Sequence, residues 1–67
     1  MGKGNLYNDI HKGLYTSAIF EINEIKSKSP HLGKYCDLLI EILNQSIISK
    51  NRPLKRVINP LIDKILL

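Results

Sequence analysis

Residues 32–49, LGKYCDLLIEILNQSIIS, decide the fold of this chain. Their apolar side chains recur at steps of three and four residues, which is the period of an α-helix. The apolar arc comprises Leu32, Tyr35, Cys36, Leu39, Ile40, Ile42, Leu43 and Ile47. The polar stripe is narrow and comprises Lys34, Asp37, Glu41, Asn44 and Gln45. A helix with so wide an apolar arc packs against neighbours on more than one side. We therefore expect a central helix that begins at about Leu32 or Lys34 and ends near Ser49.

Breaks in the pattern occur on both sides of this segment. Pro30 and Gly33 interrupt the chain before it, and Asn51, Arg52 and Pro53 interrupt the chain after it. Upstream, apolar residues between Tyr7 and about Ile25 again recur at helical spacing and predict a single helix. A strand over 15–25 is the alternative, because several residues there are β-branched or aromatic, but their alternation is poor. Gly13 lies within that stretch and costs a helix about 1 kcal/mol relative to alanine.

Downstream of the second break, one apolar stripe comprises Leu54, Val57, Ile58, Leu61, Ile62 and Ile65. Pro60 interrupts this stripe, because proline removes a backbone hydrogen bond and clashes with the preceding turn. We expect either a kinked helix or a short helix over 54–58 followed by a second one from Pro60. The predicted fold class is therefore all-α, a small three- or four-helix bundle. We expect one domain over residues 1–67, with residues 1–5 flexible.

The chain is short for an independent domain. A domain of about this size buries only about 60% of the surface of its unfolded chain, so its core is marginal. Disulfides, a structural metal or a second copy are the usual supports. Cys36 is the single cysteine, and the two histidines lie far from it in sequence. We therefore expect no disulfide, metal or other cofactor, and we expect self-association, as a homodimer, or binding to a larger partner.

Catalytic motifs are absent from the sequence, which has no glycine-rich phosphate loop, metal-spacing motif or nucleophile elbow. Asp37 and Glu41 lie one helical turn apart, but they belong to the polar stripe of the central helix. Cys36 lies on the apolar arc, where a thiol usually acts as a small hydrophobic group. We expect a protein that is not an enzyme.

Charge is concentrated in one segment. The net charge is +4, and the six acidic residues are balanced by basic residues elsewhere in the chain. The excess therefore comes from Lys50, Arg52, Lys55 and Arg56. Cations at the start of a helix oppose the helix dipole, so packing alone does not explain them. We interpret these four residues as an anion- or partner-binding patch, and the alternative is a solvated corner that only increases solubility.

The C-terminal residues Ile65, Leu66 and Leu67 are apolar, although a terminus is normally solvated. We expect them to lie in an interface. The predicted apolar interface comprises Leu54, Ile58, Leu61, Ile62, Ile65 and Leu66.

These features favour a small interaction module, of inhibitor or adaptor type, that binds a larger protein through its C-terminal third. The alternative is a small nucleic-acid-binding protein that uses the patch between Lys50 and Arg56. No apolar run reaches the roughly 18 residues of a membrane span, and the N-terminus lacks the apolar stretch of a signal peptide. We expect a cytoplasmic location.

Overall fold

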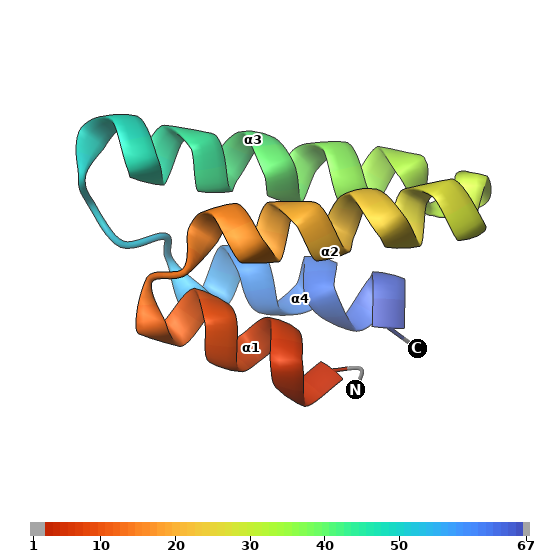
Figure 1. The fold of residues 1–67 in the computed structure, drawn as a ribbon, viewed down its shortest axis with the longest axis horizontal. Coiled ribbons are helices and arrows are strands. Elements are labelled where there is room, and N and C mark those ends of the chain that lie inside the picture. Colours follow the sequence, from red (N-terminus) through yellow and green to blue (C-terminus); the bar gives the residue numbers. More distant parts are fainter. Residues whose placement is uncertain (1–2, 67) are drawn as a thin grey trace.

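The computed structural model describes residues 3–66, and these form an all-helical bundle, as predicted (Figure 1). No strand occurs within this range. The elements are α1 (Lys3–Lys12), α2 (Tyr15–Lys28), a 3₁₀ turn η1 (Pro30–Leu32), α3 (Gly33–Ser49) and α4 (Lys55–Leu66). The bounds of α3 agree with those expected for the central helix.

Successive helices run in opposite directions, so α1 and α3 run one way and α2 and α4 the other (Figure 1). α3 packs against both α2 and α4, and α1 packs against the same two helices. Short connections favour this antiparallel arrangement of neighbouring helices. The prediction that the most apolar helix has neighbours on more than one side is confirmed.

One hydrophobic core lies between the helices, and every helix contributes to it. The buried apolar side chains are Leu6, Ile10, Ala18, Ile22, Cys36, Leu39, Leu43, Ile58, Ile62 and Ile65. Full burial of a leucine or isoleucine side chain contributes about 1.5–3 kcal/mol to stability. The core therefore joins α1 to α4, because Leu6 and Ile65 belong to the same cluster.

The prediction of one helix between Tyr7 and Ile25 is wrong. α1 ends at Lys12, and Gly13 adopts φ +84°, in the left-handed region. The amide of Gly13 donates to the carbonyl of Ile10 (3.1 Å), and the amide of Leu14 donates to that of Asp9 (2.8 Å). These two bonds form a Schellman motif, which satisfies carbonyls at the end of α1. Gly13 therefore terminates a helix rather than weakening one.

The expectation that residues 1–5 are flexible stays a prediction. α1 begins at Lys3, earlier than the sequence pattern predicted. The buried side chains of Leu6 and Ile10 attach this helix to the core. Met1 and Gly2 lie outside the described residues, as does Leu67.

Pro60 lies inside α4, which continues from Lys55 to Leu66 as one helix. Of the two arrangements left open by the sequence, the structure therefore rejects separate helices before and after Pro60. The connection from α3 to α4 begins at Lys50, which has a left-handed backbone with φ 59°. This conformation turns the chain out of α3 and toward the start of α4.

Candidate interaction surfaces

The apolar residues predicted to form an interface do not share one surface. Ile58, Ile62 and Ile65 are 3%, 0% and 5% exposed, so they belong to the core of the single chain. Leu61 and Leu66 are half-buried. Leu54 is 59% exposed and is the only fully surface-lying member of the predicted set. Three of the six predicted residues therefore pack inside the single chain, and an interface that involves the other three stays a prediction.

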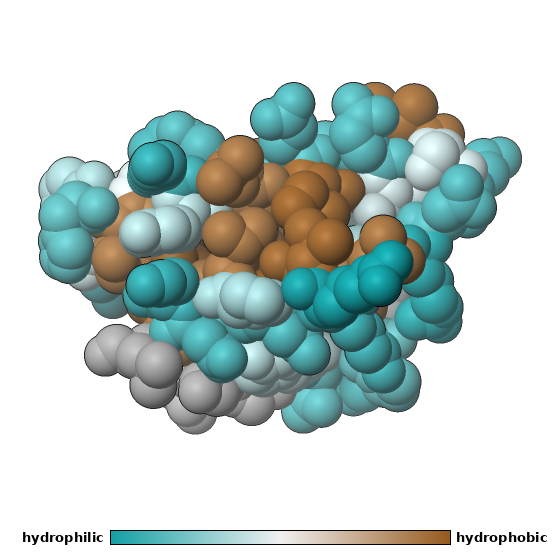
Figure 2. All heavy atoms as spheres, turned by 180° about the vertical axis from the view of Figure 1, so that it is seen from behind, coloured by the Kyte–Doolittle hydropathy of each residue, from teal (hydrophilic) through white to brown (hydrophobic). Residues whose placement is uncertain are grey.

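A different apolar surface lies between α3 and α4. It is an open groove of about 440 Å³, which we call the α3–α4 groove. Its lining residues are Leu38, Glu41, Ile42, Gln45, Ser46, Ser49, Asn51, Arg52, Pro53, Leu54 and Val57. Figure 2 shows a hydrophobic area in the middle of one face of the molecule, with hydrophilic side chains around it.

Exposure in the groove is high for apolar residues. Leu38 is 44% exposed, Val57 is 42% exposed, and Leu54 lies beside them on the same surface. Single exposed apolar residues are common on proteins, and Phe20 and Ile48 are examples here. A contiguous apolar patch with a polar rim is instead typical of a binding surface.

Cations lie near both ends of the α3–α4 groove. Arg52 lines the end at the α3–α4 connection. Beyond the other end, the Nζ atom of Lys64 lies 6.0 Å from the ring centroid of Tyr35, one helical turn before Leu38. This distance is at the limit of a cation–π contact. Among the described lining residues Arg52 is the one cation and Glu41 the one carboxylate, whereas Lys64 lies outside the groove.

The four predicted anion-binding cations are exposed, but the fold gives them different neighbours. Lys50 borders a shallow hollow with Gly13 and Tyr15, at the end of α3. Arg52 borders that hollow, the α3–α4 groove and a third cavity. Lys55 borders only the third cavity among these, and Arg56 borders none of the three. The four cations therefore do not line one common cavity.

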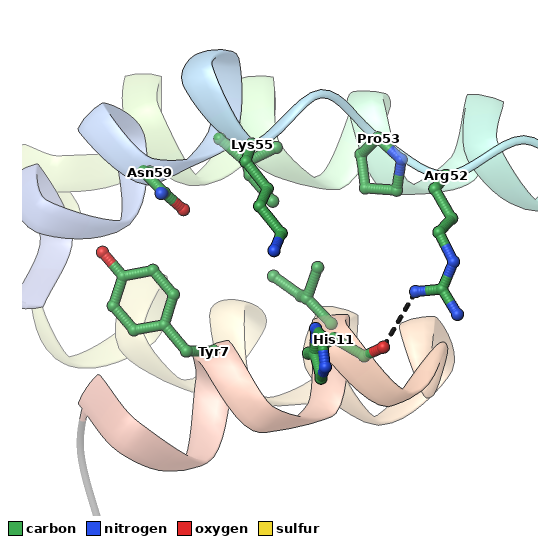
Figure 3. Close-up of a pocket in the computed structure, with 8 residues that line it drawn as sticks. Tyr7, His11, Arg52, Pro53, Lys55 and Asn59 are labelled. Carbon is green, nitrogen blue, oxygen red and sulfur yellow. Dashed lines mark hydrogen bonds between the residues drawn. The ribbon is translucent and has the colours of Figure 1, made fainter.

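The third cavity lies between α1 and the start of α4, and we call it the α1–α4 hollow (Figure 3). It has a volume of about 190 Å³. Its lining residues are Tyr7, Ile10, His11, Arg52, Pro53, Lys55, Ile58 and Asn59. The Nη1 atom of Arg52 donates to the backbone carbonyl of His11 at 2.8 Å. Because His11 lies in the last turn of α1, Arg52 satisfies a carbonyl there and complements the negative end of the helix dipole.

A hydrogen bond joins α1 to α4 beside this hollow. The hydroxyl of Tyr7 donates to Oδ1 of Asp63 at 2.8 Å. This bond raises the pKa of Tyr7, and desolvation and the negative charge of Asp63 act in the same direction. The carboxylate of Asp63 in α4 therefore already accepts a hydrogen bond from Tyr7 in α1.

Two of the residues considered for catalysis, Cys36 and Asp37, have different surroundings. Cys36 is fully buried in the core, and burial together with the charge of Asp37 raises the pKa of its thiol. A raised pKa lowers the thiolate fraction, which is the reactive form. Asp37 is exposed and pairs with Lys26 of α2 at 2.6 Å. Within residues 3–66, no group of three His, Cys, Asp or Glu side chains is placed to hold a metal ion.

Residues from α1 were missed by the sequence interpretation of the basic segment. Tyr7, His11 and Asn59 join Arg52 and Lys55 in the α1–α4 hollow, although Tyr7 and Asn59 lie 52 positions apart in a chain of 67 residues. Leu38 was missed in the groove because it lies beside the main apolar arc of α3. A signal for α1 was present in the sequence, because His11, Lys12 and Gly13 together are typical of a helix C-terminus.

None of the helices described is both long enough and apolar enough to cross a membrane. Comparison with known proteins finds no matching protein-family model, no significantly similar curated protein and no significantly similar solved structure. What the two surfaces bind is therefore argued from their geometry and chemistry alone.

Proposed function

We propose that this chain is a small, non-enzymatic interaction module of the cytoplasm, of inhibitor or adaptor type, which binds a larger protein through the α3–α4 groove. The observation that carries this proposal is the exposure of Leu38, Leu54 and Val57, between 42% and 59%, on one continuous surface. Covering apolar surface contributes roughly 25 cal/mol per Å² removed from water. A partner that covers these three side chains is stabilised by that burial.

The shape of the groove favours an amphipathic helix of the partner as its occupant. Leu38 and Ser49 mark its extent along α3 and lie roughly 16 Å apart at 1.5 Å per residue. That length matches about three turns of helix. A helix with apolar side chains at positions i, i+4 and i+7 can bury all of them in such a groove. Acidic residues near both ends of this helix would complement Arg52 and Lys64.

A second copy of the chain is the other occupant that the sequence predicts. A two-fold axis can place the two grooves parallel or antiparallel. In both cases Arg52 and Lys64 of one copy face Arg52 and Lys64 of the other, so cations lie opposite cations. We therefore propose that the homodimer is weaker than the complex with an acidic partner. Raising the salt concentration screens both interactions and should strengthen self-association while it weakens partner binding. Sedimentation velocity at two ionic strengths measures the first effect.

The decisive variant is Leu54→Asp. The carbonyl of Leu54 accepts hydrogen bonds from the amides of Val57 (3.0 Å) and Ile58 (3.1 Å), so this residue directly precedes α4. Aspartate is favoured at that position because its carboxylate accepts a backbone amide of the first turn. The substitution therefore places a charge in the groove without removing support from α4.

The matched control is Ile48→Asp, because Ile48 is 74% exposed on α3 but does not line the groove. Each protein is immobilised and exposed to an extract of its native cell, once untreated and once treated with nuclease, and bound proteins are identified by mass spectrometry. The wild type and Ile48→Asp should retain the same partner, and Leu54→Asp should lose it. Equal retention by Leu54→Asp would exclude the groove, and loss of the partner only after nuclease treatment would favour the nucleic-acid alternative.

A further inference from the structure

The α1–α4 hollow is a cavity of limited size lined by two cationic side chains, Arg52 and Lys55, and it is separate from the α3–α4 groove except at Arg52 and Pro53. We propose that this hollow is a binding site for a small phosphate group, either inorganic phosphate or the terminal phosphate of a small metabolite. The proposal does not depend on the protein partner of the groove.

Basic side chains converge on the hollow from two sides. Lys55 extends from the first turn of α4 into the space above α1, and Arg52 reaches the end of α1 from the α3–α4 connection (Figure 3). His11 lines the same space from α1. None of the residues described as lining the hollow carries a carboxylate. The cavity therefore gathers donors and positive charge with no internal counterion.

Arg52 is oriented before any ligand arrives. One of its N–H groups donates to the carbonyl of His11, and a guanidinium carries five such donors. The remaining donors are available in a side chain whose direction is already fixed. A preoriented donor loses less conformational freedom when it binds, and guanidinium groups match the geometry of phosphate oxygens.

Lys55 has no internal interaction that explains its position. Within the described part of the chain it forms no hydrogen bond or ion pair, and it lies in the first turn of α4. A cation there opposes the helix dipole. A phosphate beside Lys55 removes this conflict, because it is attracted both by the ammonium group and by the positive end of α4. Capping of α1 explains Arg52, but it does not explain Lys55.

The remaining walls suit a small polyatomic anion. Asn59 supplies an amide donor, and Ile10 and Ile58 give the hollow an apolar floor that strengthens electrostatic attraction. Asp63 does not line the hollow, and its carboxylate accepts the hydroxyl of Tyr7. A volume of about 190 Å³ exceeds the roughly 30 Å³ of one water molecule several-fold, so a phosphate group is accommodated.

The test uses the full chain labelled with ¹⁵N and titrated with sodium phosphate, against sodium chloride at the same ionic strength. Phosphate-specific shifts should centre on the amides of His11, Lys55 and Asn59. Lys55→Gln should weaken phosphate binding about tenfold, as expected for loss of a hydrogen bond to a charged group. Arg56→Gln is the matched control, because it removes the same charge one position away and outside the hollow. It should change the affinity less than about twofold.

Two results would overturn the proposal: no shifts beyond those in chloride, or equal weakening by Lys55→Gln and Arg56→Gln. Arg52→Gln is a secondary variant whose helix content is checked by circular dichroism, because Arg52 also caps α1. Adenosine 5′-monophosphate, adenosine and a blunt DNA duplex without terminal phosphates distinguish the sources of phosphate. The monophosphate should bind with the same dependence on Lys55 and adenosine should not bind. A third result would also overturn the proposal: binding of the duplex that depends equally on Lys55 and Arg56, while inorganic phosphate causes no response. A general basic surface and not the hollow would then bind phosphate groups.

Discussion

Two glycines of this chain have different backbone roles. Gly13 ends α1 with φ +84°, whereas Gly33 begins α3 with φ −54° in ordinary helical geometry. A Cβ atom at Gly13 would meet nothing within 4 Å, so any cost of a side chain there is conformational. A Cβ atom at Gly33 would lie 3.5 Å from Cε of Lys26, which is ordinary van der Waals contact. Only Gly13 is therefore required by the backbone.

Gly13→Ala should lower the free energy of unfolding by about 1–2 kcal/mol, the cost of a left-handed conformation for a residue with a Cβ atom. Gly33→Ala should raise it by about 0.4–1 kcal/mol, because alanine restricts the unfolded chain and fits a helix. Urea denaturation followed by circular dichroism measures both. Equal changes in the two variants would contradict the distinction between these positions.

At the scale of the element, α4 forms despite a proline in its interior. Pro60 has no amide hydrogen to donate to the carbonyl of Arg56, and its ring crowds that carbonyl. The helix persists because Ile58, Ile62 and Ile65 are buried against the other helices. Burial of three aliphatic side chains outweighs a local cost of about 3 kcal/mol.

Pro60→Ala should therefore stabilise the protein. Pro60 is exposed, so its removal loses little packing, and alanine restores the missing hydrogen bond. We expect the free energy of unfolding to rise by about 1–3 kcal/mol in urea denaturation. Pro53→Ala is the control in the connection before α4, where loss of proline should destabilise by about 0.4–1 kcal/mol. A destabilised Pro60→Ala variant would show that the proline itself is needed for packing.

At the scale of the whole molecule, one small core supports all four described helices. A chain of this length is expected to have a free energy of unfolding of roughly 3–10 kcal/mol. Removing one large side chain from the core costs a substantial part of that amount. Cooperative unfolding is the consequence, because each described helix depends on the same cluster of buried residues.

Ile62→Ala should lower the free energy of unfolding by about 2–5 kcal/mol, because Ile62 is 0% exposed and its truncation leaves a cavity. Loss of helix content should occur in α1 as well as in α4, since both pack on this core. Hydrogen exchange followed by NMR measures the effect at each helix. Ile48→Ala, at a side chain that is 74% exposed, should change stability by less than about 0.5 kcal/mol. Protection lost only within α4 would contradict a single cooperative core.

The sequence alone was sufficient for the fold class and for the bounds of α3, because a helix has a fixed period and its apolar arc is visible as a local pattern. It also located Pro30 and residues 51–53 as breaks. The end of α1 was missed although His11, Lys12 and Gly13 are typical of a helix C-terminus, because the apolar spacing continues across Gly13. Spacing alone therefore did not separate one long helix from two shorter ones.

Only the tertiary structure decided which exposed residues form a site. Ile58 and Leu54 belong to the same sequence stripe, yet one is 3% and the other 59% exposed. This difference in exposure depends on which neighbouring helices cover each side chain, and the periodicity of the sequence does not contain that information. The basic segment from Lys50 to Arg56 is likewise evident as charge in the sequence. Arg52 and Lys55 of this segment line a hollow together with His11, because the core brings α1 against α4.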